Sequence, residues 1–90
     1  MTETVAPGGK DVLSVVRESL AVVLELDPGH IASDSVLDRD LGVDSIGRIH
    51  LADLLELRLA AAAPRLRIDD DDLRGFGTVN DVVAFVAARL

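Results

Sequence analysis

The chain has 90 residues, 16 acidic and 9 basic, with a formal net charge of -7. This length suits one domain with one modest core, and the acidic balance argues against a nucleic-acid partner because phosphate binding depends on clustered Lys and Arg. Cysteine is absent, which excludes disulfides and a cysteine nucleophile, and no apolar run nears the roughly 20 residues that span a bilayer, so we expect a cytoplasmic protein without membrane association.

The N-terminal residues 1–9 are small and polar and contain one Pro-Gly-Gly sequence. This composition predicts a disordered tail, followed by a single domain over residues 10–90. The initiating Met and this tail favour a free-standing protein. In residues 10–26, apolar side chains recur at spacings of three and four, which predicts an amphipathic helix. The Asp-Pro-Gly sequence that follows ends this helix.

A long connection over residues 27–44 precedes the second helix. Its apolar residues predict a loop that packs onto the bundle: Ile31, Val36, Leu37, Leu41 and Val43. The second helix is expected to begin at about Ser45, with Asp44 as N-cap, and to run into an alanine block that Pro64 ends. Its inward face is predicted to consist of Leu51, Ala52, Leu55, Leu59 and Ala62.

The last third of the chain predicts one short and one longer helix. The segment "DLRGFG" is too brief and too rich in glycine for more than one or two helical turns. Thr78 and Asp81 resemble a capping box that opens the final helix. The core face of that helix is predicted to contain Val79, Val82, Val83, Phe85, Val86 and Leu90. The sequence therefore predicts an all-α fold, a small bundle of three main helices plus one short helix.

Ser45 stands where the second helix begins. The first amides of a helix are unpaired and carry the positive end of the macrodipole, so a phosphate esterified to this serine would be favoured there. A side chain at this position also projects from the end of the bundle, where a modifying enzyme can reach it.

The stretch "DLGVDSI", residues 40–46, resembles the phosphopantetheine attachment motif of acyl carrier proteins, usually Leu-Gly-x-Asp-Ser-Leu. The resemblance extends over roughly residues 10–90, including the order of the helices. It implies that Ser45 receives a covalent phosphopantetheine from coenzyme A, with Asp44 as the acid beside it. Leu41 and Gly42 would shape the preceding turn.

The resemblance implies a carrier that is not itself an enzyme and has no catalytic residues. Its terminal thiol would hold acyl groups as thioesters, which this cysteine-free chain cannot do without an added thiol. The expected partners are a phosphopantetheinyl transferase, acyl-loading enzymes and ketosynthase-type enzymes, and we expect a monomer. A cleft that shelters an apolar chain could be lined by residues that more simply fill the core: Leu51, Leu55, Leu59, Ile68 and Phe85.

The second helix also carries the predicted partner-docking residues, namely Ile46, Arg48, Ile49, His50 and Asp53. Gly47, Arg48 and His50 stand where fatty-acid carriers tend to have acidic residues. This difference favours a carrier of specialised metabolism, and "GVDSIGRI" resembles polyketide-type carriers. An aminoacyl, peptidyl or D-alanyl carrier is the alternative, and an unmodified helical adaptor with Ile46 and Ile49 as anchors is another.

A hydrolase with Ser45 as nucleophile is the competing class. Five positions separate Ser45 and His50 by roughly 140° around a helix, so the two side chains do not share a face. Both His30 and His50 are expected at the surface. The acidic run over residues 69–72 is expected to be a solvated face that caps the short helix, without a metal.

Overall fold

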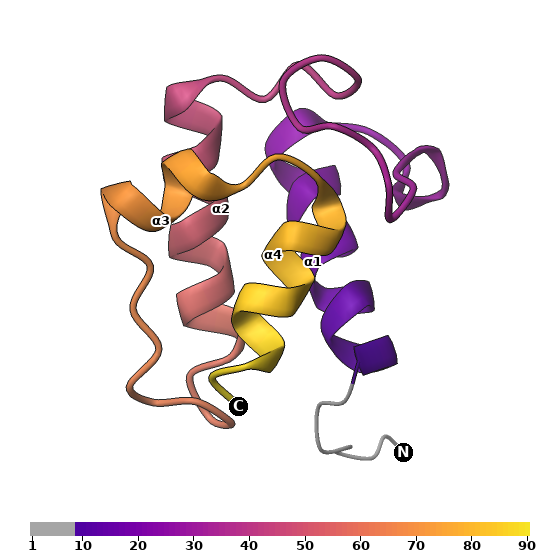
Figure 1. The fold of residues 1–90 in the computed structure, drawn as a ribbon. Helices are drawn as coiled ribbons and strands as arrows, with labels where there is room; N and C mark the ends of the chain where they lie inside the picture. Colours follow the sequence, from indigo (N-terminus) through magenta and orange to yellow (C-terminus); the bar gives the residue numbers. More distant parts are fainter. Residues whose placement is uncertain (1–8) are drawn as a thin grey trace.

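The computed structural model describes residues 9–90, which form four α-helices and one 3-10 turn (Figure 1). The elements are α1 (Gly9–Leu24), η1 (Pro28–His30), α2 (Ser45–Arg58), α3 (Asp70–Gly75) and α4 (Val79–Ala87). Within this described range there is no strand, and a single antiparallel bridge joins Val36 to Thr78. The predicted all-α bundle of three main helices and a short one is confirmed. The expected tail lies outside the described residues, except for Gly9, which begins α1.

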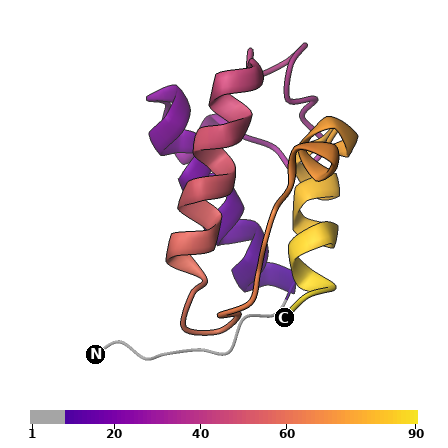
Figure 2. The ribbon, with the colours of Figure 1, turned by 90° about the vertical axis from the view of Figure 1, so that its left-hand side faces the viewer.

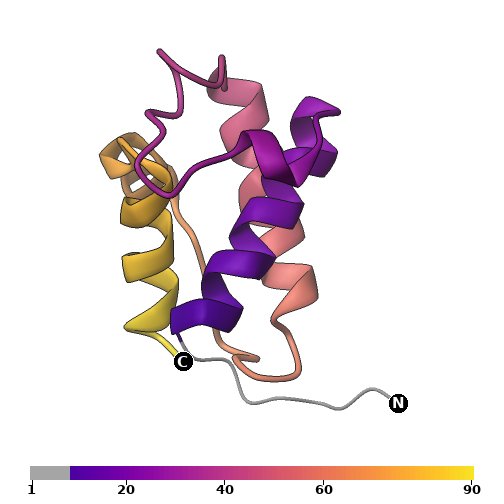
Figure 3. The ribbon, with the colours of Figure 1, turned by 90° about the vertical axis from the view of Figure 1, so that its right-hand side faces the viewer.

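The three longer helices stand side by side, with α1 packed against both α2 and α4 (Figures 1 and 2). The connection over residues 27–44 crosses the end of the bundle where α2 begins, and the chain after α2 turns back at the opposite end (Figure 3). The short helix α3 packs against α2. Ser45 therefore lies at one end of the bundle, beside the long connection.

One hydrophobic cluster fills the space between the helices. Its fully buried side chains come from α1, α2, α4 and the long connection, and include Val16, Leu20, Leu37, Leu51, Leu55, Val82 and Val86. Four of the five candidate cleft residues are buried in this cluster, and Phe85 packs partly buried against it. Its ring meets that of Phe76 edge-on, with 5.3 Å between centroids. These five side chains therefore fill the core, as the simpler interpretation held.

The long connection is anchored by side chains and by backbone. Ile31, Leu37 and Val43 are buried, and Val36 and Leu41 are partly buried, which confirms that this loop packs onto the bundle. The Leu37 N–H donates to the Gly77 carbonyl at 2.9 Å, and the Val43 N–H donates to the Leu37 carbonyl at 2.8 Å. The connection is thus tied both to itself and to the start of α4.

Three predicted helix ends are wrong. α1 ends at Leu24, because Glu25 turns into the left-handed region with φ 56°. α2 ends at Arg58, and the Ala63 N–H then donates to the Leu59 carbonyl at 2.7 Å in a turn that directs Ala63 into the core. Ala62 is consequently exposed. Leu90 is 40% exposed because α4 already ends at Ala87.

Among residues 9–90, no helix is both long enough and apolar enough to cross a membrane.

Candidate functional site

The turn that precedes α2 depends on a glycine and a carboxylate. Gly42 has φ 71°, a left-handed conformation that favours glycine. Just before this glycine, the Val36 N–H donates to Asp40 Oδ2 at 2.8 Å, and this bond closes a turn over residues 36–40. This backbone bond lowers the pKa of the Asp40 carboxyl, assisted by Arg39 and opposed by desolvation. The chain thus enters α2 along a fixed path, with the partly buried Leu41 packed against the core.

Asp44 caps α2 as predicted. Its Oδ1 accepts a hydrogen bond from the Gly47 N–H at 2.7 Å. Gly47 itself is buried, and a Cβ there would lie 3.2 Å from both Asp44 Oδ1 and Val43 Cγ1. From the family resemblance, Gly47 was expected on the exposed recognition surface, together with Arg48 and His50. It is instead a packing position that lets the cap approach the helix closely.

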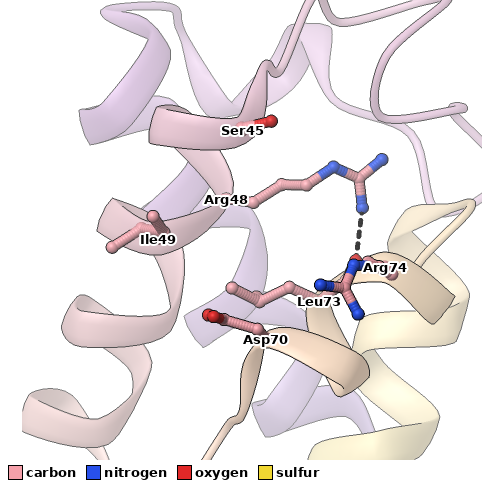
Figure 4. A pocket seen from close by; sticks show the side chains of 6 residues that line it. All are labelled: Ser45, Arg48, Ile49, Asp70, Leu73 and Arg74. Atoms are coloured by element: carbon pink, nitrogen blue, oxygen red, sulfur yellow. Dashed lines mark hydrogen bonds between the residues drawn. The ribbon is translucent and has the colours of Figure 1, made fainter.

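Ser45 is the first residue of α2 and its side chain is exposed. It lines an open groove of about 420 Å³ between the start of α2 and the short helix α3 (Figure 4). The lining residues are Ser45, Arg48 and Ile49 from α2, and Asp70, Leu73 and Arg74 from α3. An exposed hydroxyl beside a groove can accept a covalent group and leave room for its first atoms.

Arg48 joins the two walls of this groove. Its Nη1 donates to the Leu73 carbonyl and to the Phe76 carbonyl, both at 2.7 Å (Figure 4 shows the first bond). These carbonyls lie at the C-terminal end of α3, where a cation is electrostatically favoured. Sequence reasoning missed this role because the partners are 25 and 28 positions away along the chain.

The other predicted docking residues are at the surface. Ile46 is 63% exposed and Ile49 is 46% exposed, and the side chains of His50 and Asp53 are also exposed. His50 and Asp53 line a hollow toward α1, with Val22, Val23 and Leu54. Their role in docking stays a prediction.

The remaining candidates are separated from this groove or serve the fold. His50 lies in the hollow toward α1, whereas Ser45 lines the groove toward α3, so these two side chains lie on different sides of α2. His30 is exposed, as expected. In the acidic run, Asp72 Oδ2 accepts the Asp69 N–H at 3.0 Å, which confirms a capping role. The described part of the chain contains no cluster of His, Asp and Glu that could hold a metal.

The sequence matches a known family of proteins. Residues 14–86 match the phosphopantetheine attachment site family. An acyl carrier protein of Prochlorococcus marinus (strain MIT 9515) is 36% identical over 78 residues, which cover 87% of this chain and 86% of that protein. Meromycolate extension acyl carrier proteins of Mycobacterium tuberculosis and Mycobacterium bovis are 27% identical over 77 residues, 86% of this chain and 63% of theirs.

The chain therefore belongs to the phosphopantetheine attachment site family, and within it to the acyl carrier proteins. Its cofactor is phosphopantetheine, attached covalently. The structure fits such a group, because an exposed hydroxyl at a capped helix start adjoins an open groove.

Proposed function

We propose that Ser45 is the residue that carries the phosphopantetheine arm. The chain has four other serines, at positions 14, 19, 33 and 35. Ser19 is fully buried in α1, and Ser35 Oγ accepts the Ala32 N–H at 3.2 Å within the long connection. The observation that carries the proposal is the exposed Ser45 side chain, which lies beside the groove at the start of the helix that Asp44 caps.

The chain's own residues present the arm and do not act on the cargo. When bound, the group supplies a terminal thiol that holds an acyl group as a thioester. Asp44 fixes the start of α2, Gly42 sets the turn before it, and Ser45 offers its hydroxyl at the end of the bundle. We therefore propose a non-catalytic carrier whose partners are a phosphopantetheinyl transferase, acyl-loading enzymes and ketosynthase-type enzymes. It would act in the cytoplasm as a monomer.

Intact mass tests the attachment residue. The protein is incubated with coenzyme A and a broad-specificity phosphopantetheinyl transferase, and we expect the mass of one arm to be added. Ser45→Ala should take up none, with unchanged helix content because Asp44 still caps α2. Ser14→Ala, at another exposed serine, is the matched control and should be modified like the wild type. Modification of the Ser45→Ala protein would show that the assignment is wrong.

We further propose that the carrier serves a specialised pathway, polyketide synthesis being the best-supported one. With neutral His50, α2 has Arg48 and Arg58 against Asp53 and Glu56, so its formal charge is 2 − 2 = 0. Of the three positions where fatty-acid carriers tend to have acidic residues, Gly47 is buried and Arg48 is bound to α3. His50 is then the position where an acidic residue would most directly change the exposed charge.

His50→Glu tests this assignment. Charges at the rim of an interface mostly set encounter rate and discrimination. We expect the loaded wild-type protein to be a poor substrate for a bacterial fatty-acid ketosynthase, and His50→Glu to raise the rate at low salt. The gain should shrink as salt rises, because exposed charges are screened over about 10 Å at 0.1 M. Leu57→Glu is the control, since it adds charge at the far end of the same helix. Efficient use of the wild type would argue for a fatty-acid carrier.

The group bound to the arm distinguishes an acyl carrier from an aminoacyl, peptidyl or D-alanyl carrier. Mass spectrometry of the protein isolated from its source would show an acyl group for the proposed function. An aminoacyl or peptidyl group would instead support the aminoacyl, peptidyl or D-alanyl carrier.

A further inference from the structure

Arg48 lies next to Ser45 on the groove side of α2. The two residues are three positions apart on one helix, where neighbouring side chains have Cβ atoms about 5–6 Å apart. Both line the same groove, and Figure 4 shows the Ser45 hydroxyl and the Arg48 guanidinium on the same side of α2. An anion esterified to Ser45 is therefore within reach of this guanidinium.

The guanidinium is also held in a fixed position. Both of its bonds to α3 come from Nη1 and measure 2.7 Å, to the carbonyls of Leu73 and Phe76. Arginine has five N–H donors in a planar fork that matches phosphate geometry. Nε and Nη2 keep donors that these two bonds do not use. Because Nη1 is anchored, the orientation of the remaining donors is set before an anion arrives.

The other charged side chains around the groove are not bound to backbone carbonyls of α3 as Arg48 is. Arg74 Nη1 donates to Asp71 Oδ1 at 2.6 Å in an exposed ion pair. Asp44 Oδ1 accepts the Gly47 N–H, and Asp70 adds a negative charge to the groove wall. Arg48 is thus the groove cation that lies on the same helix as Ser45 and is fixed by backbone carbonyls.

We propose that Arg48 positions the phosphodiester of the arm: Nε and Nη2 bind the phosphate on Ser45 while Nη1 stays bound to α3. Modification of Ser45 is thereby coupled to the placement of α3. The coupling is reciprocal, so α3 also restrains the first bonds of the arm. This inference rests on the proposed attachment at Ser45 and adds to it a positioning residue.

The experiment compares unmodified and modified forms of three proteins: wild type, Arg48→Gln and Arg74→Gln. Arg74→Gln is the matched control, since it removes one positive charge from the same groove and leaves both bonds to α3 in place. Intact mass first establishes the arm. Phosphorus NMR then gives the chemical shift and relaxation of the phosphodiester, and hydrogen exchange gives the protection of the amides of residues 73–79.

In the wild type we expect slower exchange in this segment after modification than before it. Arg48→Gln should accelerate exchange in both forms, abolish the difference between them, and change the shift and relaxation of the phosphorus signal. Arg74→Gln should leave the phosphorus signal and the exchange difference as in the wild type. Should Arg48→Gln fail to fold, Arg48→Lys keeps the charge without the planar fork, and the inference then requires its phosphorus signal to differ from that of the wild type.

Two results would overturn the inference. The first is a phosphorus signal that is the same in wild type and Arg48→Gln, with faster exchange alone; Arg48 would then serve only to hold α3. The second is an equal change of the phosphorus signal in Arg74→Gln, which would indicate general electrostatics. A failure of the attachment proposal is recognised separately, because intact mass would then show no arm on Ser45.

Discussion

The two long connections on either side of α2 are held in different ways. The connection before α2, residues 27–44, buries Ile31, Leu37 and Val43 and is tied to the start of α4 by backbone hydrogen bonds. After α2, Leu66 and Ile68 in the connection and Leu73 in α3 are also buried. The hydrogen bonds that join Ile68 and α3 to α2, however, come from two charged side chains of α2. Glu56 Oε2 accepts the Ile68 N–H at 2.9 Å, and Arg48 donates to the end of α3.

This difference assigns different tasks to the two connections. Backbone hydrogen bonds to the start of α4 restrict the first connection to one geometry, and this connection determines where Ser45 lies. Because side chains can exchange hydrogen-bond partners at lower cost than backbone, we predict that the second connection, and with it one wall of the groove, is the more adjustable one. The proposed attachment site would then lie between a rigid side, the first connection, and an adjustable side, the second connection with α3.

The largest expected effect comes from breaking the rigid side. Leu37 is fully buried at the centre of the first connection. We predict that Leu37→Ala lowers the free energy of unfolding by about 2–5 kcal/mol, the usual cost of removing a buried leucine side chain. Urea unfolding measures it. The control Leu57→Ala, at a 73% exposed position, should change stability by no more than about 0.5 kcal/mol. A similar small loss for both variants would contradict the rigid role.

Removing the arginine from the adjustable side should cost less. In Arg48→Met, the Phe76 carbonyl loses its charged donor, whereas the Leu73 carbonyl keeps its bond from the Phe76 N–H at 3.2 Å. We predict a loss of about 1–3 kcal/mol, the range for leaving buried polar groups unsatisfied. Hydrogen exchange should locate the loosening in α3 and spare residues 31–43. Arg74→Met breaks only an exposed ion pair and should cost about 0.2–1 kcal/mol. Uniform loosening of both connections in Arg48→Met would remove the distinction between them.

These two sides also differ in how far the sequence predicts them. The start of α2 was predictable, because Asp44, Ser45 and Gly42 act on neighbours within a few residues, and local side-chain chemistry determines caps and turns. The apolar spacing likewise indicated the buried faces. The end of α2 was not predictable, because Ala60 to Ala63 favour helix by propensity and the tertiary packing of Leu59 and Ala63 overrides it.

The groove itself could not be derived from the sequence. Its second wall comes from α3, and the contacts of Arg48 and Glu56 join residues far apart along the chain. A single arginine on a predicted helix indicates an exposed charge as readily as a bond to a distant carbonyl. The buried position of Gly47 was equally hidden, because it depends on how Val43 and the Asp44 cap approach the helix.

Acid should weaken the rigid side, through Asp40 before α2 and Asp81 at the start of α4, to which the first connection is bound. The Asp81 carboxylate accepts the N–H groups of Thr78 and Gly77, and these bonds lower its pKa. The bond from Val36 lowers that of Asp40. A folded-state pKa below the unfolded value means that each group stabilises the fold above its unfolded pKa, and that this contribution is lost as the pH falls through the folded pKa.

The corresponding measurement is the thermal midpoint as a function of pH. We predict that the midpoint falls below about pH 4, the region in which an ordinary Asp titrates. Asp81→Asn should lower the midpoint at neutral pH and flatten this acid dependence. Asp34→Asn, at an exposed carboxyl that takes no part in these bonds, is the control. An unchanged acid slope in Asp81→Asn would show that its bonds to Thr78 and Gly77 do not contribute.

The smallest effect on stability is expected at the surface that borders the adjustable side. Ile49 is 46% exposed and lines the groove, whereas Leu57 is 73% exposed on the same helix, far from Ser45. We predict that Ile49→Glu and Leu57→Glu each change the free energy of unfolding by no more than about 0.5 kcal/mol, because exposed substitutions rarely do more. Acyl transfer to a partner enzyme should fall in Ile49→Glu and not in Leu57→Glu, since both add the same charge but one lies beside the attachment site. A large loss of stability in Ile49→Glu would show that Ile49 supports the packing of α3. Equal transfer by both variants would instead place the docking surface elsewhere on the bundle.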